Sequence, residues 1–173
     1  PFTVYPRPVA VFTVSSQTIC EGQSVIFSSQ STFADSLVWD MGDGTILIGN
    51  SVVYTYPTAG NYPITLSVYG AGGCSDISIL NPGIQVNPTP IAGFEFINIQ
   101  NQDPLSGTVE FTNQSQNASA YDWQFGNGHS SSEINPTEKY YQYGTFEVTL
   151  IASNQFGCAD TLVQLIKTDF DAG

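Results

Sequence analysis

Few residues in this sequence are of types that could do chemistry, and the most suggestive are two aspartates three positions apart, Asp40 and Asp43. Two carboxylates so spaced on a turn can share a hard cation such as Ca²⁺. However, no Asp-rich calcium loop surrounds them, and a second copy of the same motif has Gln124 and Asn127 in their places. We therefore expect structural roles for both aspartates, no metal site and no cofactor.

His129 is the single histidine of the chain, so a Ser/His/Asp or Cys/His arrangement would depend on it alone. It follows a predicted hairpin turn, and Thr45 occupies the equivalent place in the first copy of the motif. Acidic residues such as Glu133 and Glu138 lie in predicted loops, where no apolar pocket is evident to raise a carboxyl pKa. We predict that the chain is not an enzyme.

The charge of the chain is strongly acidic, with three Lys and Arg residues against fifteen Asp and Glu and a formal net charge of −12. Such a field repels phosphate backbones and anionic membrane surfaces, which excludes nucleic acid as a partner. No apolar run approaches the roughly 18 residues that a membrane span needs, so we expect no membrane insertion. The sequence lacks an initiator Met, and we expect it to be a segment of a longer exported chain.

The hydrophobic residues are mostly Val, Ile, Phe and Tyr, and they stand among Ser, Thr, Asn and Gly. This mixture favours strands and turns over helices. The nearest approach to a helical period, Ala159 to Lys167, is β-branched and alternating, which indicates a strand. Turn signals recur about every 8 to 12 residues, the spacing typical of a sandwich or barrel. The sequence predicts an all-β fold.

The chain repeats itself without gaps at an offset of 84 residues, the distance from Trp39 to Trp123. Many of the matched residues are of rare types, so the match is a duplication rather than a compositional bias. The pairs include Phe27 and Phe111, Gly42 and Gly126, Gly44 and Gly128, Tyr56 and Tyr140, Gly60 and Gly144, Cys74 and Cys158, and Asp76 and Asp160.

Seven strands are expected in each copy, enough for two packed antiparallel sheets. In the first copy they are predicted at about 9–14, 24–29, 36–41, 45–48, 51–56, 61–69 and 76–86. In the second copy they are predicted at about 91–98, 107–112, 120–125, 129–132, 137–141, 145–153 and 160–167.

A Pro-x-Pro linker marks the domain boundaries, because the stretch 86–92 resembles 4–10. Two prolines in three residues favour an extended, stiff joint. One interpretation is that residues 1–7 are the tail of a preceding repeat; an unrelated Pro-rich terminus is the alternative. The predicted domains are a tail or linker at 1–7, repeat 1 at 8–88, repeat 2 at 89–168 and a C-terminal linker at 169–173.

Two motifs resemble those of the polycystic-kidney-disease (PKD) domain family, whose signature is Trp-Asp-Phe-Gly-Asp-Gly followed by Tyr-x-x-x-Gly-x-Tyr-x-Val-x-Leu-x-Val. The resemblance extends from about Val9 to Lys167 and implies two tandem immunoglobulin-like β-sandwiches. Gln124 and Asn127 depart from the family pattern. The residues that carry the resemblance are Trp39, Asp40, Gly42, Asp43, Gly44, Tyr56 and Gly60 in the first copy, and Trp123, Gly126, Asn127, Gly128, Tyr140 and Gly144 in the second.

These motif residues also have a physical interpretation of their own. Asp43-Gly44 and Asn127-Gly128 predict type I′ hairpin turns, which need positive φ at both central positions. Gly42 and Gly126 are expected to let the strand kink before the turn. The two tryptophans are the bulkiest core candidates. Tyr56 and Tyr140 are expected to bury their rings and to make a hydrogen bond like that of a tyrosine corner.

The three cysteines predict one disulfide. Cys20 and Cys74 each precede a predicted strand of repeat 1, whereas repeat 2 keeps Cys158 but has Pro104 where its partner would stand. We predict a Cys20–Cys74 disulfide, which implies an oxidising, exported setting, and a free thiol at Cys158.

Two functions stay open. The pairing of Cys20-Glu-Gly22 with Gly73-Cys74-Ser-Asp76 resembles PKD repeats of exported Bacteroidota proteins, gliding-associated adhesins among them. This resemblance implies an extracellular spacer or adhesive stalk of a large bacterial cell-surface protein, with further repeats of the same chain as neighbours and surface ligands bound through the parent protein. The alternative is a polysaccharide- or protein-binding accessory module of a secreted hydrolase, with Tyr141 and Tyr143 as the candidate ligand surface. A component of an envelope machine is a third class.

Overall fold

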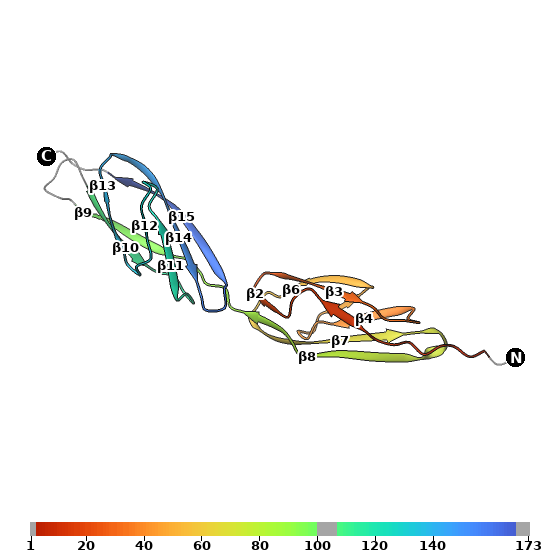
Figure 1. Ribbon diagram of the computed structural model, residues 1–173. Coiled ribbons are helices and arrows are strands. Elements are labelled where there is room, and N and C mark those ends of the chain that lie inside the picture. Colours follow the sequence, from red (N-terminus) through yellow and green to blue (C-terminus); the bar gives the residue numbers. More distant parts are fainter. Residues whose placement is uncertain (1–2, 100–106, 169–173) are drawn as a thin grey trace. The chain divides into compact units, whose positions relative to one another are not determined.

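The computed structural model describes residues 3–99 and 107–168, and the predicted C-terminal linker and Pro104 lie outside these residues. The chain divides into two compact units, Pro1–Pro88 and Thr89–Gly173, which contain repeat 1 and repeat 2 respectively (Figure 1). Each is an immunoglobulin-like sandwich of two sheets. Within the described residues, no helix is long and apolar enough to cross a membrane.

Repeat 1 packs a three-stranded sheet, in the order β1-β3-β6, against a five-stranded sheet, in the order β2-β8-β7-β4-β5. All neighbouring strands are antiparallel except β2 and β8, which are parallel. The strands are β1 (Phe12–Val14), β2 (Thr18–Cys20), β3 (Ser24–Ser29), β4 (Ser36–Asp40), β5 (Ile46–Ile48), β6 (Ser51–Thr55), β7 (Gly60–Tyr69) and β8 (Ser75–Asn87), with a short 3₁₀ turn at Ala71–Gly73.

Repeat 2 has the same plan, with a three-stranded sheet in the order β13-β10-β9 and a four-stranded sheet in the order β12-β11-β14-β15. All its neighbouring strands are antiparallel. The strands are β9 (Phe94–Ile99), β10 (Gly107–Asn113), β11 (Ala120–Gln124), β12 (Ser130–Ser131), β13 (Thr137–Tyr140), β14 (Gly144–Ser153) and β15 (Ala159–Thr168).

The predicted all-β sandwich fold is confirmed, and one strand was missed. The missed strand is β2, whose three residues pair with Gln85–Asn87 at the end of β8. A three-residue strand shows too little alternation to be recognised, and its parallel partner is distant in the sequence. The stretch of repeat 2 that corresponds to β2 lies outside the described residues.

The core of each repeat is built around one tryptophan, as expected from the motifs. Trp39 and Trp123 are both fully buried. The Trp39 ring lies 5.9 Å from that of Phe27, and the Trp123 ring lies 5.5 Å from that of Phe111, between ring centroids. Alternation along the strands places these large rings between the two sheets, where each contributes a large apolar area.

Each tryptophan also ties the core to the chain that passes from one sheet to the other. Its indole nitrogen donates a hydrogen bond to the carbonyl oxygen of Gly49 in repeat 1, at 2.8 Å, and of Glu133 in repeat 2, at 2.9 Å. Gly49 lies between β5 and β6, and Glu133 lies between β12 and β13. The buried N–H group is therefore satisfied, and the crossing segment is fixed to the core.

A buried tyrosine hydroxyl joins the two sheets of each repeat. Tyr56 donates a hydrogen bond to the carbonyl oxygen of Met41 at 3.1 Å, and Tyr140 donates one to that of Phe125 at 2.9 Å. The expected buried rings and satisfied hydroxyls are confirmed, but the acceptors lie fifteen residues upstream on the opposite sheet, so this is not a tyrosine corner. Burial raises the pKa of both hydroxyls far above the ordinary tyrosine value.

We expect Tyr140→Phe to lower the free energy of unfolding of repeat 2 by about 1–3 kcal/mol, because the Phe125 carbonyl would lose its partner in the core. Urea denaturation of the full chain, followed by circular dichroism and tryptophan fluorescence, measures the loss. Tyr69→Phe, at a half-exposed ring of repeat 1, is the control and should change little. Equal losses for the two variants would contradict the bridging role.

Candidate functional site

The loop that follows the central strand of each larger sheet carries the predicted motif residues. In repeat 1 the Met41 N–H donates to the Thr45 carbonyl at 3.0 Å and closes a loop of Gly42, Asp43 and Gly44. Both glycines have positive φ, +81° and +94°, whereas Asp43 does not. The predicted type I′ Asp-Gly turn is therefore wrong, and a three-residue Gly-x-Gly loop stands in its place.

Repeat 2 has the same loop, closed by the Phe125 N–H and the His129 carbonyl at 3.1 Å. The first glycine of each loop is required by contact as well as by φ. A Cβ on Gly42 would lie 2.5 Å from the Pro63 carbonyl oxygen, and one on Gly126 would lie 2.6 Å from that of Glu147. The close approach of β7 or β14 to the loop leaves room for hydrogen only.

The two motif aspartates of repeat 1 accept hydrogen bonds from the loop itself. Asp40 accepts from the Gly42 N–H at 2.9 Å, and Asp43 accepts from the Thr45 N–H at 2.9 Å and from the Tyr54 hydroxyl at 2.7 Å. Partial burial by itself would raise the pKa of Asp43, but the hydrogen bonds from Tyr54 and Thr45 lower it below the ordinary aspartate value. These contacts give both carboxylates structural partners.

The described residues hold no cluster of side chains that could bind a metal ion. Across residues 3–99 and 107–168, no group of three or more His, Cys, Asp or Glu side chains is placed to hold a metal ion. The expectation of no metal stays a prediction.

In repeat 2 a glutamate that contacts His129 and Asn127 replaces the tyrosine that steadies the loop in repeat 1. Glu138 stands where repeat 1 has Tyr54. Its Oε1 atom accepts from the Asn127 side-chain amide at 2.8 Å and lies 2.7 Å from Nδ1 of His129. The His129 side chain is 63% exposed, and within the described residues no hydroxyl or thiol is bonded to its ring. The ring therefore has no nucleophile beside it.

The exchange of Tyr54 for Glu138 removes a ring from an aromatic cluster. In repeat 1 the Tyr54 and Tyr62 rings both pack on Tyr56, with centroids at 4.9 and 4.5 Å. In repeat 2 the cluster is reduced to Tyr140 and Phe146, with centroids at 4.5 Å.

A hollow of about 370 Å³ lies beside the reduced cluster. Of the two candidate ligand residues, Tyr141 lines it and Tyr143 does not. Both are more than half exposed, whereas Tyr140 is buried, as the alternation predicts. The other lining residues are Gly126, Asn127, His129, Tyr140, Gln142 and Phe146.

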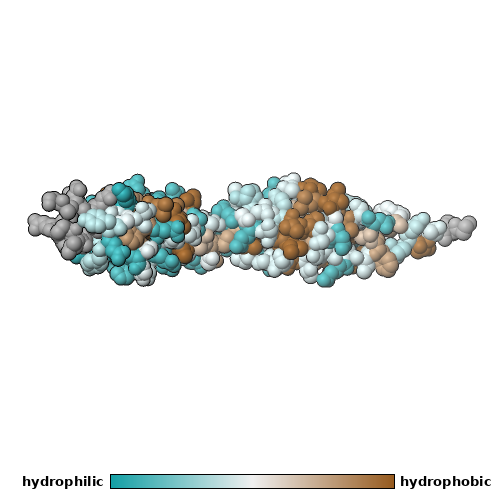
Figure 2. Space-filling view, turned by 90° about the horizontal axis from the view of Figure 1, so that it is seen from above, coloured by the Kyte–Doolittle hydropathy of each residue, from teal (hydrophilic) through white to brown (hydrophobic). Residues whose placement is uncertain are grey.

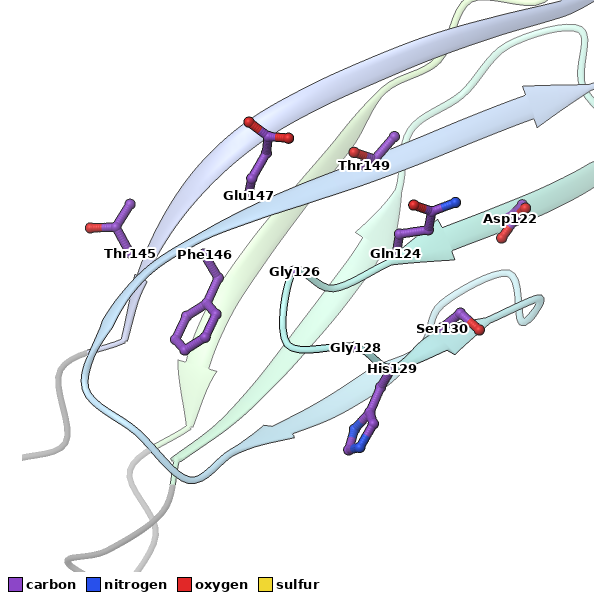
Figure 3. Close-up of a pocket in the computed structure, with 10 residues that line it drawn as sticks. All are labelled: Asp122, Gln124, Gly126, Gly128, His129, Ser130, Thr145, Phe146, Glu147 and Thr149. Atoms are coloured by element: carbon purple, nitrogen blue, oxygen red, sulfur yellow. The ribbon is translucent and has the colours of Figure 1, made fainter.

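A second hollow, of about 650 Å³, lies over the outer face of β11, β12 and β14 (Figure 3). Figure 3 shows Glu147 and Thr149 on one side of β14 and the ring of Phe146 on the other. Gln124 and Asp122 reach the hollow from β11. Its polar lining residues lie on adjacent strands, where alternation brings them to one face.

The structure corrects both cysteine predictions. Cys74 is a free thiol, so the predicted Cys20–Cys74 disulfide is wrong. Cys158, predicted to be free, is disulfide-bonded, and so is Cys20. In the sheet, Cys20 lies opposite Asn87, the last residue of strand β8, whereas Cys74 directly precedes the first residue of that strand. Thirteen residues of strand, about 40 Å, separate these positions, far beyond the roughly 7 Å limit between the Cα atoms of a disulfide.

The sequence analysis did not predict the structural roles of Asp76 and Asp160. Asp76 accepts a hydrogen bond from the Ala10 N–H at 2.8 Å, and Asp160 accepts one from the Ala92 N–H at 2.9 Å. Hydrogen bonds from the N–H groups of Ala10 and Ile77 lower the pKa of Asp76. Each aspartate thus holds the segment by which the chain enters its repeat. Their recurrence in the duplication was the available signal.

Comparison with known proteins gives matches for both repeats. A family model described as the PKD domain matches residues 5–80 and 86–168. The pre-pro-metalloprotease PrtV of Vibrio cholerae is 35% identical over 83 residues, which are 48% of this chain and 9% of that protein. The chain therefore spans less than a tenth of the length of that relative.

Two solved structures are similar to one repeat each. The PKD1 domain of Vibrio cholerae PrtV is 38% identical and covers 47% of this chain and 98% of its own, with a TM-score of 0.40. The PKD1 domain of Vibrio anguillarum Epp is 30% identical and covers 49% of this chain and 99% of its own, with a TM-score of 0.41.

The paired sheets and the two Gly-x-Gly loops define a tandem immunoglobulin-like β-sandwich protein. Since the two family matches together cover most of the sequence, the chain belongs to the PKD domain family. PKD domains are non-catalytic modules.

We expect Gly42→Ala to destabilise repeat 1 more than Gly44→Ala. Positive φ costs an alanine about 1–2 kcal/mol at either position. A Cβ at Gly42 would also press on the Pro63 carbonyl, whereas a Cβ at Gly44 would meet no heavy atom within 4 Å. Urea denaturation of both variants measures the difference, and equal losses would show that the close approach is unimportant.

Alkylation should find Cys74 as the reactive thiol of the oxidised chain, because disulfide sulfurs do not alkylate. We expect iodoacetamide under denaturing, non-reducing conditions to label Cys74 alone, and prior reduction to expose Cys20 and Cys158 as well. Peptide mass spectrometry identifies the labelled sites. Cys74→Ser is the control and should take up no label before reduction; labelling of unreduced Cys158 would contradict the assignment.

Proposed function

We propose that the chain is a non-catalytic spacer segment of an exported surface protein. Its repeats would hold another part of the parent protein at a distance from the cell. The observation that carries this proposal is the short, firmly anchored connection between the repeats.

Backbone hydrogen bonds anchor each end of the connection to the repeat on that side. In repeat 1 the carbonyl of Asn87, the last residue of β8, accepts the Glu21 N–H at 3.0 Å. In repeat 2 the Ile91 N–H donates to the Gln116 carbonyl at 3.0 Å, and Ala92 is held by Asp160. Only Pro88-Thr89-Pro90 lies between these anchors. Two prolines fix their own φ angles and restrict the residues before them, so this segment is stiff.

The absence of catalysis is part of the proposal. His129 is the single histidine of the chain, and its Nδ1 atom lies 2.7 Å from Glu138, a contact that supports the Gly-x-Gly loop. A nucleophile paired with its base would need a hydroxyl or thiol in hydrogen-bond reach of the ring. The contact between His129 and Glu138 instead supports a structural role.

Export is supported by the cysteines. Cys20 and Cys158 are disulfide-bonded, and disulfides persist in extracellular or periplasmic settings. The resemblance of the Cys20-Glu-Gly22 and Gly73-Cys74-Ser-Asp76 segments to repeats of exported Bacteroidota proteins supports a surface adhesin as the parent.

A second candidate is an accessory module of a secreted hydrolase. It is favoured by the match to the metalloprotease PrtV, of which this chain covers a small part. The neighbouring domains in the full-length gene distinguish the candidates: a hydrolase domain favours the accessory role, and a long array of repeats favours the spacer.

We expect the double variant Pro88→Gly, Pro90→Gly to loosen the connection without destabilising either repeat, because glycine restores the φ freedom that proline removes. Amide ¹⁵N relaxation of the full chain, with its cysteines reduced so that no disulfide contributes, should show the repeats tumbling together in the native sequence and more independently in the variant. Pro57→Gly, at an exposed loop of repeat 1, is the control. Independent tumbling in the native protein would overturn the spacer proposal.

A further inference from the structure

The two repeats differ in what their surfaces could do chemically. Hydrophobic residues gather on the surface of repeat 1 (Figure 2), and the outer face of its larger sheet carries the exposed side chains of Ile46 and Ile79. Alkyl side chains take part in no reaction with water. The Gly-x-Gly loop of repeat 2, between β11 and β12 (Figure 3), instead carries an asparagine followed by a glycine, Asn127-Gly128.

Asn127 is the single asparagine of the chain that precedes a glycine. An asparagine can lose its side-chain amide when the backbone nitrogen of the next residue attacks its Cγ atom. A side chain on that next residue hinders the attack, and glycine has none. In repeat 1 the same place in the loop is taken by Asp43, which has no amide to lose. At this loop the reaction is therefore open to repeat 2 only.

The attacking nitrogen, that of Gly128, is available in the folded chain. Among the described residues, no group accepts a hydrogen bond from the Gly128 N–H. Gly128 is exposed, and a Cβ built on it would meet no heavy atom within 4 Å, so the loop has room for a five-membered ring. Asn127 itself is partly exposed, so water reaches the site.

The side-chain amide that would be attacked is held by two hydrogen bonds. The Oδ1 atom of Asn127 accepts one from the His129 N–H at 3.1 Å, and its Nδ2 atom donates one to Oε1 of Glu138 at 2.8 Å. A donor at Oδ1 stabilises the negative charge that this oxygen takes up when the Gly128 nitrogen bonds to Cγ, as a donor of an oxyanion hole does. The fold thus places an activated carbonyl next to a backbone nitrogen that is free to attack it.

We propose that Asn127 is a site of spontaneous deamidation in the folded chain, a modification that the spacer role neither needs nor implies. The Gly128 nitrogen gives up its proton to a hydroxide ion and forms a bond to Cγ of Asn127. The Cγ–Nδ2 bond then breaks, and the amide group leaves as ammonia with a proton from water, which restores the hydroxide. Water opens the resulting succinimide ring at either carbonyl and gives aspartate or isoaspartate.

The aspartate product places two carboxylates at one point of the loop. It can keep the hydrogen bond from the His129 N–H, as Asp43 keeps that from the Thr45 N–H at 2.9 Å. Toward Glu138, however, the product has no donor, and the Glu138 side chain is only 12% exposed. In repeat 1 the same aspartate faces the Tyr54 hydroxyl, which does donate. Deamidation therefore destabilises the loop of repeat 2 by like-charge repulsion.

Mass spectrometry of the full chain, incubated folded at neutral pH and body temperature for several weeks, tests the site. We expect the mass shift of an amide-to-acid conversion, located at Asn127 by chymotryptic peptide mapping, with isoaspartate in part of the product. Methylation by isoaspartyl methyltransferase detects the isoaspartate. Gly128→Ala should slow the reaction roughly tenfold or more, because its methyl group hinders the attack.

The matched variant is Asp43→Asn, which builds the same Asn-Gly pair into the loop of repeat 1. A Cβ on Gly44 likewise meets no heavy atom within 4 Å, so this variant should gain a second site of deamidation. Thermal melting shows that each variant is folded, and Asp43→Asn keeps the test decisive if Gly128→Ala does not fold. No deamidation at Asn127 in the folded native chain, or none at position 43 of the variant, would overturn the proposal.

Thermal melting of Asn127→Asp tests the consequence for the loop. We expect a lower melting temperature than that of the native chain at neutral pH. The double variant Asn127→Asp, Glu138→Tyr, which has the residue pair of repeat 1, should recover most of the loss. An Asn127→Asp variant that melts with the native chain would overturn the repulsion between the two carboxylates. None of these outcomes bears on the relaxation test of the connection.

Discussion

A hydrogen bond from a buried tyrosine holds the two sheets of each repeat together at the Gly-x-Gly loop. The acceptor, the carbonyl of Met41 or Phe125, belongs to the residue just before that loop. An unpaired carbonyl in a dry core costs about as much as a hydrogen bond is worth, so the tyrosine, the loop and the strand beside it must keep one geometry. This constraint explains why the tyrosines and the loop glycines recur together in both repeats.

Both repeats keep these buried contacts, so they differ from each other at residues outside them. Tyr54 and Glu138 both steady the loop, one through its hydroxyl and the other through a carboxylate that bonds to Asn127 and His129. The two side chains differ in volume, and in repeat 2 a hollow lies beside the smaller aromatic cluster. The outer faces differ in the first strand pair, where Ile46 and Asp40 of one copy correspond to Ser130 and Gln124 of the other. Surface residues can therefore change while the buried contacts are kept.

The acidic residues of the repeated motifs bind backbone N–H groups of their own repeat. Asp40 and Asp43 serve the Gly-x-Gly loop, while Asp76 and Asp160 serve the entering chain. A carboxylate that accepts backbone N–H bonds is favoured in its charged form, in agreement with the lowered pKa values of Asp43 and Asp76. The shape of the loop and the anchoring of the connection thus depend on single side chains.

The sequence by itself determined the duplication, the sandwich and nearly all of the strands, because alternation, turn glycines and a core tryptophan are local signals that both copies carry. Only the tertiary structure decided which cysteines are bonded, which φ angles the loop uses and what Asp76 and Asp160 hold. Cys20 and Cys74 each precede a predicted strand, but they lie at opposite ends of β8. The spacing of residues in the sequence does not reveal this distance in space. The polar hollow over β11, β12 and β14 likewise depends on strands that alternation alone cannot place side by side, since cross-strand register depends on contacts far apart in the chain.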